Sequence, residues 1–149
     1  MAVTFTNNFK NILDKLESVL ESEFGNAVPV SYGSDDFHGS QYIKLLPTGN
    51  TLISYTNSSD EREYSVKIVY YFNEKFIKTK TFDHILRFVS RIEALVHDNQ
   101  IMTLDKGSDA DNSKALNCRV VSTKLDNEPI DGKYFVDLNW VCQHIGNFN

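Results

Sequence analysis

The stretch REYSVKIVYYF, which runs from Arg62 to Phe72, carries the clearest strand signal in the first half of the chain. Side chains two residues apart point to the same face of a β-strand. One face of this segment is apolar throughout, whereas the opposite face mixes polar and aromatic side chains. That apolar face consists of Tyr64, Val66, Ile68, Tyr70 and Phe72. The pattern predicts a strand with one side buried in a core.

An amphipathic helix is predicted before this strand, because apolar residues recur there at steps of three and four. Thr6, Asn7 or Asn8 can cap the start of the helix. Gly25 stands where a left-handed C-terminal cap is wanted, and Pro29 prevents the helix from resuming. The apolar stripe of this helix is Phe5, Phe9, Ile12, Leu13, Leu16, Val19, Leu20 and Phe24.

A second amphipathic helix is predicted after the strand, from about Thr81 to His97. Its charged side chains Arg87, Arg91 and Glu93 are expected to face outward. Its apolar stripe is Phe82, Ile85, Leu86, Val89, Ile92 and Val96.

Short extended segments lie between the first helix and the long strand. Val28 to Tyr32 is extended, and its proline suits the edge of a sheet better than its centre. Gln41 to Leu46 and Thr51 to Thr56 are predicted as two short strands that turn at Pro47 to Asn50. Asn57 to Glu61 is predicted as another solvated turn.

Two polar loops are candidates for contact with other proteins. The first is Gly33 to Gly39, and the second is His97 to Ser113, which follows the second helix. The second is longer than most connections in a compact domain, which is typical of an interaction loop or of disorder. Ile101, Met102 and Leu104 form a small apolar anchor within it.

The chain ends in a predicted hairpin. Leu116 to Val120 and Tyr134 to Cys142 alternate apolar and polar side chains, and Asp126 to Gly132 is a strong turn signal. A turn centred near Ile130 fixes the register of the two strands, with Cys118 opposite Cys142 and Val120 opposite Trp140. The element order α-β-β-β-(β)-α-β-β predicts the α+β class, with two helices packed on a mainly antiparallel sheet.

Composition and charge exclude several classes of protein. A length of 149 residues fits one domain, residues 1–149, and 41% hydrophobic with 23% charged residues is ordinary for a soluble domain. The net charge of −5 disfavours an outer surface that binds nucleic acid or anionic membrane. No apolar run approaches the roughly 20 residues that span a bilayer, and the first residues lack the features of a signal peptide. We therefore expect a chain made in the cytoplasm without a membrane anchor.

A search for catalytic, cofactor-binding and metal-binding residues predicts none. None of His38, His84, His97 and His144 has metal-ligand spacing with another His, Cys or Glu. The acidic cluster Asp105, Asp109 and Asp111 lacks the central glycine and the final glutamate of an EF-hand, which favours a solvated loop. No phosphate-binding glycine motif and no nucleophile elbow is present. One enzymatic alternative stays open, in which His38 acts with Asp35 or Asp36.

The two cysteines and the aromatic run have structural explanations. Cys118 and Cys142 fall on the apolar faces of their strands, where a free cysteine behaves as a small hydrophobic residue, although a cross-strand bridge is sterically feasible. Tyr70, Tyr71 and Phe72 would suit base stacking, but they lack interleaved basic residues. These negative results favour association with other proteins over catalysis.

Four segments, in their order along the chain, carry a resemblance. They are FKNILDKLESVLESEF from Phe9, REYSVKIVYYF from Arg62, FDHILRFVSRIEALVHD from Phe82 and FVDLNWVC from Phe135. Together they resemble the tail terminator and neck (head–tail joining) proteins of tailed bacteriophages. The resemblance covers nearly the whole chain and rests on element order and hydrophobic texture.

The resemblance implies a structural virion protein at the head–tail junction, and no enzyme or cofactor. Such proteins form a ring, commonly a hexamer, that caps the tail tube, stops its polymerisation and provides the surface that joins the head. The implied partners are further copies of the chain, the tail tube protein and a head-completion or connector protein, with DNA passing through the channel without sequence-specific binding. The expected contacts are Val28 to Tyr32 and the two polar loops. Alternatives are a head-side connector or tail-completion protein, and a non-viral protein-binding adaptor domain.

Overall fold

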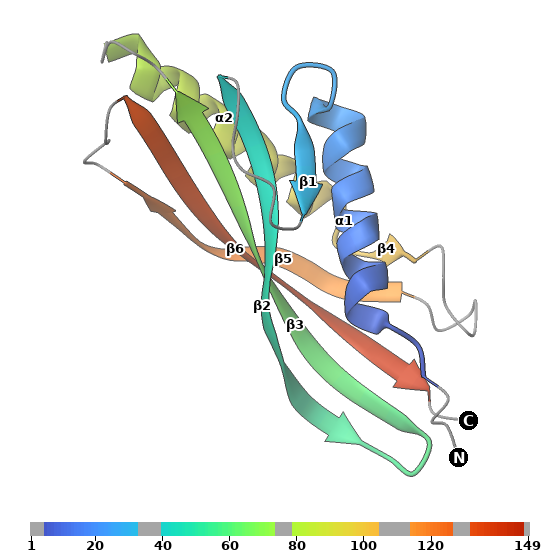
Figure 1. Ribbon diagram of the computed structural model, residues 1–149. Helices are drawn as coiled ribbons and strands as arrows, with labels where there is room; N and C mark the ends of the chain where they lie inside the picture. Colours follow the sequence, from blue (N-terminus) through green and yellow to red (C-terminus); the bar gives the residue numbers. More distant parts are fainter. Residues whose placement is uncertain (1–4, 33–39, 74–78, 105–113, 127–131, 148–149) are drawn as a thin grey trace.

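The computed structural model describes residues 5–32, 40–73, 79–104, 114–126 and 132–147 (Figure 1). Two helices and six strands follow one another along the chain, and the predicted α+β class is confirmed. The elements are α1 (Asn8–Phe24), β1 (Val30–Tyr32), β2 (Gln41–Tyr55), β3 (Ser59–Asn73), α2 (Thr79–Asp98), β4 (Met102–Thr103), β5 (Lys114–Leu125) and β6 (Lys133–Asn147).

The strands form one sheet in the order β1-β2-β3-β6-β5-β4. β1 pairs with β2 in parallel, and all the other pairs are antiparallel, as the prediction of a mainly antiparallel sheet requires. β3 and β6 pair along their whole length and form the middle of the sheet. The segment predicted to suit a sheet edge, Val28 to Tyr32, supplies the edge strand β1.

One face of the sheet and both helices enclose the core. The apolar face predicted for β3 is buried from Tyr64 to Tyr70, with Phe72 packed against the core. Phe88 of α2 stacks on Tyr70 with 4.3 Å between ring centroids and meets Phe24 of α1 at 4.8 Å. Each large apolar side chain buried in this way contributes about 1.5–3 kcal/mol to folding.

The ends of α1 differ in part from the prediction. Asn7 caps the start, and its side-chain oxygen accepts a hydrogen bond from the Lys10 backbone N–H at 3.2 Å. Phe5 precedes the helix and is exposed instead of belonging to the buried stripe. Gly25 is right-handed (φ −60°), so the predicted left-handed cap is wrong. The residue suits the site because a Cβ there would lie 2.5 Å from the Glu21 carbonyl oxygen.

The buried stripe of α2 is rotated slightly from the predicted one. Ile85, Val89, Ile92 and Val96 are buried as predicted, and Phe88, which the prediction omitted, is buried with them. Phe82 and Leu86 are exposed, because the stripe of a helix that lies on a sheet is set by the strands beneath it. The predicted outward charges Arg87, Arg91 and Glu93 are exposed.

The hairpin turn predicted at Pro47 to Asn50 is wrong. β2 runs without a break from Gln41 to Tyr55, and register shifts at Pro47/Gly49 and Leu52/Ser54 absorb the irregular residues. Gly49 takes a φ of +149°, which a glycine adopts easily. The chain turns later, at residues 56–58, where the Thr56 N–H donates to the Ser59 carbonyl oxygen at 2.8 Å. The second predicted turn therefore also ends too late, because Asp60 and Glu61 belong to β3.

The C-terminal hairpin forms as predicted, with Val120 opposite Trp140. Cys118 is displaced from a regular pairing because β5 bulges between Leu116 and Arg119. In the loop after α2, Met102 and Leu104 are buried as an anchor, whereas Ile101 is exposed. Three features of the sequence analysis lie outside the described residues: the loop with His38, the acidic cluster after Leu104, and the turn around Ile130.

Candidate functional site

The sheet extends well past the helices at one end (Figure 1). We call this end the arm and define it as residues 50–55 of β2, 59–64 of β3 and 143–147 of β6. Its three strands pair continuously with the rest of the sheet, from Asn50 opposite Tyr64 to Ser59 opposite Asn147. The arm is therefore an extension of the same sheet and not a separate element.

Polar side chains of the arm bond to one another. Arg62 donates to Asn50 Oδ1 at 3.0 Å and to Asp60 Oδ2 at 3.2 Å. Ser54 Oγ donates to Glu61 Oε2 at 3.1 Å across the two strands. Cross-strand contacts of this kind favour one register of a hairpin. The arm is thus held in a defined shape before any partner arrives.

The base of the arm is tied to the start of α1. Phe9 packs edge-on against Tyr64 with ring centroids 5.0 Å apart, and Tyr64 meets the His144 ring at 6.2 Å. A Cβ at Gly146 would lie only 2.9 Å from Asn8 Nδ2, so the missing side chain permits this close approach. Burial raises the pKa of the Tyr64 hydroxyl, which also hydrogen-bonds the Asn8 side chain.

His144 is buried at this base, and its Nδ1 atom has no hydrogen-bond partner among the described residues. Burial lowers the pKa of the imidazole below its usual 6.5, because the charged form would lose its hydration. The ring is therefore a neutral packing element with an unsatisfied nitrogen. Such a group makes the junction between the arm and α1 sensitive to acid.

The outer part of the arm leaves large apolar side chains bare. Leu52, Ile53, Tyr55 and Ile145 are 41 to 73% exposed. They come from two strands, and the register places Leu52 and Tyr55 on the face that continues the core side of the sheet. Large exposed apolar groups that gather on one element mark surfaces for protein contact. The arm is the best candidate for a functional surface in the described residues.

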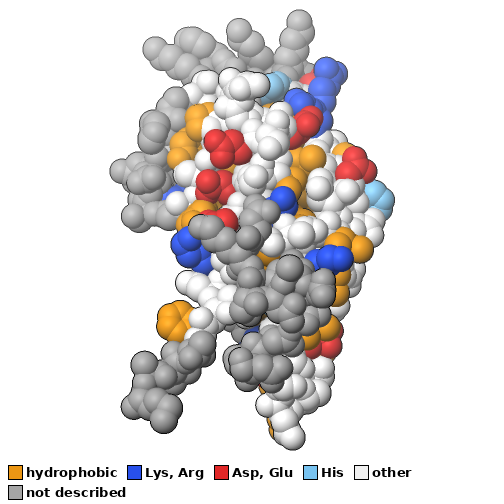
Figure 2. All heavy atoms as spheres, turned by 90° about the vertical axis from the view of Figure 1, so that its right-hand side faces the viewer, with side chains coloured by type: hydrophobic (Ala, Val, Ile, Leu, Met, Phe, Trp, Pro, Cys, Tyr) orange, Lys and Arg blue, Asp and Glu red, His pale blue; other side chains and the backbone are white. Residues whose placement is uncertain are grey.

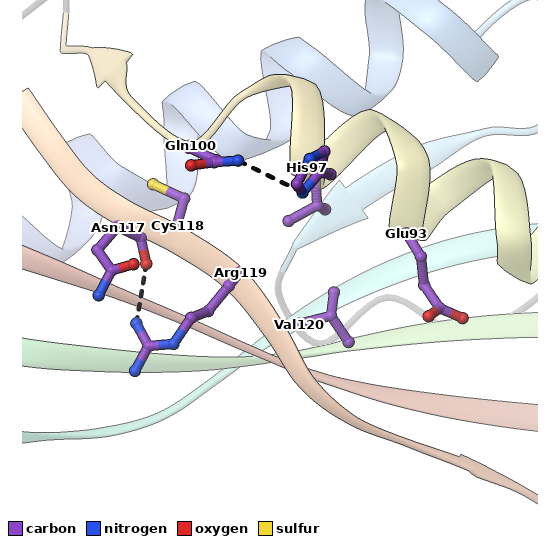
Figure 3. A pocket seen from close by; sticks show the side chains of 8 residues that line it. Glu93, His97, Gln100, Asn117, Cys118, Arg119 and Val120 are labelled. Carbon is purple, nitrogen blue, oxygen red and sulfur yellow. Dashed lines mark hydrogen bonds between the residues drawn. The ribbon is translucent and has the colours of Figure 1, made fainter.

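A pocket of about 310 Å³ lies between the end of α2 and β5 (Figure 3). His97 and Glu93 line it from the helix, and Cys118, Arg119 and Asn117 line it from the strand. The side chains do not form a catalytic set: His97 Nδ1 bonds Gln100 at 3.3 Å, and Arg119 donates to the Asn117 carbonyl oxygen at 2.9 Å (Figure 3). The His97 and Arg119 side chains therefore form hydrogen bonds with neighbouring residues of the pocket.

Cys118 and Cys142 are buried and free, in agreement with the expectation of core thiols. Asn117, with a φ of 53°, forms the bulge that turns Cys118 inward. The Cys142 thiol donates a hydrogen bond to the Cys118 sulfur, which lowers the pKa of Cys118 and raises the pKa of Cys142. Cys118 in turn contacts the Ala115 carbonyl oxygen at 3.6 Å. The two thiols are neighbours as predicted, although Cys118 lies in the bulge and not in a regular pair with Cys142.

No single charge dominates the described residues on the side of the molecule that Figure 2 shows. Acidic, basic and apolar side chains are interspersed there. Among the described residues no group of three or more His, Cys, Asp or Glu could hold a metal ion. No helix in the described ranges is long and apolar enough to cross a membrane.

The predicted contact surfaces and the arm hardly overlap. Of the segments expected to make contacts, β1 lies at the sheet edge, and the loops before Ser40 and after Leu104 fall outside the described residues. The arm was not predicted, because Pro47 to Asn50 has the composition of a turn. The signal that could have found it is the uncharged run from Thr48 to Tyr55, which ends in three large apolar residues.

Comparison with known proteins gives a likeness in fold alone. No protein-family model matches the chain, and no curated protein matches it. A chain in a solved structure described as the virion of a native gene transfer agent particle superposes with a TM-score of 0.60 and 13% sequence identity. The match covers 93% of this chain and 92% of the other. The two chains therefore share an α+β fold over nearly their whole lengths.

Proposed function

We propose that this chain is a structural protein of a phage-like virion and that it acts by assembling with other proteins. The observation that carries the proposal is the preformed arm, whose apolar side chains are bare although its polar groups are paired. The shared fold with a chain of a gene transfer agent virion supports the kind of particle, because the match spans both chains. Assembly would cover the apolar surface that the isolated chain exposes.

Within such a particle, we place the chain at the head–tail junction as a tail terminator. In this role it forms a ring, commonly of six copies, that caps the tail tube, stops its growth and presents a surface to the head. This follows the resemblance of the sequence to tail terminator and neck proteins. The net charge of −5 suits a ring whose channel lets DNA slide through. No catalytic step belongs to this role.

Native mass measured over a range of protein concentrations tests the ring. Six copies of the 17.0 kDa chain would give a species of about 102 kDa, and electron microscopy should show it as a ring. A monomer at every concentration, with or without tail tube protein, would overturn the ring and favour the adaptor alternative.

Tube growth tests the position of the ring. Tail tube protein that polymerises in the presence of this chain should stop growing once the tube ends are capped. Tubes that grow unchanged beside a stable ring would favour a head-side connector over a terminator. The enzymatic alternative rests on His38 with Asp35 or Asp36, and it predicts that His38→Ala abolishes whatever activity the chain has.

A further inference from the structure

The sheet leaves a stretch of backbone uncovered on each of its two sides. β1 pairs with β2 only at residues 43–45, so no described strand lies along the outer edge of β2 at residues 46–55. β4 pairs with β5 only at residues 114–115, so the outer edge of β5 at residues 119–125 is likewise without a described neighbour. The N–H and C=O groups of such edges are a template for pairing with another chain.

The uncovered edge of β2 has no charged residue to protect it, although its pairing with β3 shifts register at Pro47/Gly49 and Leu52/Ser54. Proteins that stay monomeric place lysines, prolines or inward-pointing charges on an edge strand. Pro47 interrupts β2 at the start of its uncovered part, but residues 48–55 contain no proline and no charged residue. They include Leu52, Ile53 and Tyr55, which are all exposed. An edge of this length and composition requires a partner strand or it invites aggregation.

The charges near the two edges are opposite in sign. Residues 46–55 of β2 carry no charge themselves, and the carboxylates next to them lie on β3, the neighbouring strand. β5 carries Lys114, Arg119 and Lys124 and no acidic residue. The arm carries three carboxylates, on Asp60, Glu61 and Glu63, against the single guanidinium of Arg62. The β5 edge also bears its own exposed apolar side chains, Val121 and Leu125.

Some of these charges are already paired within the chain. Arg62 pairs with Asp60 at 3.2 Å, and Arg119 reaches Glu63 at 3.5 Å. Glu61 and Lys124 have no partner of opposite charge among the described residues. Among the described residues the Glu61 carboxylate, which accepts a hydrogen bond from Ser54, and the Lys124 ammonium therefore form no ion pair.

We propose that the β2 edge of one copy, at residues 46–55, lies along the β5 edge of the next copy, at residues 119–125. The two edges belong to opposite sides of the sheet and differ in sequence and charge, so the contact joins unlike surfaces. A contact between unlike surfaces repeats from copy to copy and closes into a ring when the rotation fits. The inference rests on the proposed function, because it names the surfaces through which the copies form the ring.

Cross-linking between two variants that each carry one added cysteine tests this pairing. Ile53→Cys and Val121→Cys place reactive thiols on the two edges, while the native cysteines are buried. One variant carries a larger tag, the two are mixed in equal amounts, and a flexible bis-maleimide is added. Covalent pairs of mixed mass should be about tenfold more abundant than pairs of either variant with itself. The chain without substitutions serves as the control for reaction at Cys118 and Cys142.

The outcomes separate this inference from the proposed function. If the native mass shows a ring but mixed pairs are not in excess, the edge pairing is overturned and the ring stays in place. An excess of like pairs would indicate a two-fold contact, and equal amounts of mixed and like pairs would indicate unspecific collision; either result would also overturn the edge pairing. A chain that stays monomeric at every concentration would overturn both proposals.

A lysine placed on the edge gives a second readout. Ile53→Lys and Leu86→Lys change side chains of nearly equal exposure, 47% and 48%, on β2 and on α2. We expect Ile53→Lys to raise the concentration needed for assembly by about tenfold or more, because a charge would be buried in the contact. Leu86→Lys should leave that concentration unchanged. Equal effects of the two variants on assembly, with unchanged unfolding curves, would contradict the pairing.

Discussion

β3 passes through two environments, and the contrast between them explains how the molecule is divided. From Tyr64 to Tyr71 its side chains are largely buried, and those on the core side lie beneath the two helices, whereas from Ser59 to Glu63 its side chains are half-buried and neither helix covers them. The backbone ladder to β2 and β6 is continuous through both parts. Hydrogen bonds therefore extend the sheet, but apolar burial stabilises only the covered half. The side chains of the arm contribute little to folding and are free to meet a partner.

The largest expected effect contrasts two isoleucines of the same sheet. Ile68→Ala should lower the free energy of unfolding by about 2–5 kcal/mol, because Ile68 is completely buried and the substitution leaves a cavity. Ile53→Ala should lower it by less than about 0.5 kcal/mol, since this exposed side chain removes little surface from water. Urea unfolding of both variants measures the difference. A loss of similar size at the two positions would mean that the arm belongs to the core after all.

The covered half was largely predictable from the sequence, and the arm was not. Periodicity located Ile12, Leu16 and Leu20 in the core because burial on one side forces a regular repeat. In the outer part of the arm neither face is buried: residues 51–55 of β2 are all exposed, so their sequence has no regular apolar repeat that would indicate a strand. The Pro47 to Asn50 segment looks like a turn by composition. Only the long partner strand β3 shows that β2 continues past it.

The packing at Cys118 shows that the sequence predicts the register of the terminal hairpin but not its local irregularities. The spacing of the terminal hairpin correctly placed Val120 opposite Trp140 and brought the two cysteines together. The bulge at Asn117 could not be foreseen, because a non-glycine residue with positive φ depends on the surrounding contacts. The tilt of α2 that buries Phe88 in place of Leu86 is likewise decided by the strand residues it meets.

The next effect concerns acid and the junction between the two halves. Burial lowers the pKa of His144 in the folded chain, so the unfolded chain binds the proton more readily. The contribution of His144 is complete above its ordinary pKa of 6.5 and is lost as the pH falls through the lowered value. The free energy of unfolding should then drop by at most about 1.4 kcal/mol per pH unit.

Urea unfolding at pH 7.5 and 5.5 (about one unit on either side of the ordinary histidine value) checks this dependence. His144→Phe keeps an aromatic ring beside Tyr64 and removes the titrating group, so its two curves should lie closer together than those of the unchanged chain. The same shift in both proteins would assign the acid sensitivity to other groups.

A smaller effect on stability is expected from two single hydrogen bonds, one at the start of α1 and one in the arm. Asn7→Ala removes the cap of α1, which should cost about 1 kcal/mol of unfolding free energy. Ser54→Ala removes an exposed hydrogen bond to Glu61 within the arm and should cost less than about 0.5 kcal/mol. Thermal or urea unfolding compares the two. If Ser54→Ala lowered the free energy of unfolding more than Asn7→Ala, the arm would stabilise the fold instead of depending on it.

Reversal of two charges should have the smallest effect on folding and the clearest effect on assembly. Glu61→Lys and Lys124→Glu reverse two charges that have no opposite partner within the described chain, so each should change the free energy of unfolding by less than about 0.5 kcal/mol. Each variant alone should assemble less readily, because it brings like charges near the contact, where Glu61 lies on β3, one strand behind the β2 edge. The double variant should recover assembly, since the attraction is restored with its sign exchanged. Native mass against protein concentration distinguishes these cases, and a double variant that assembles worse than either single variant would show that the two side chains do not lie near each other at the contact.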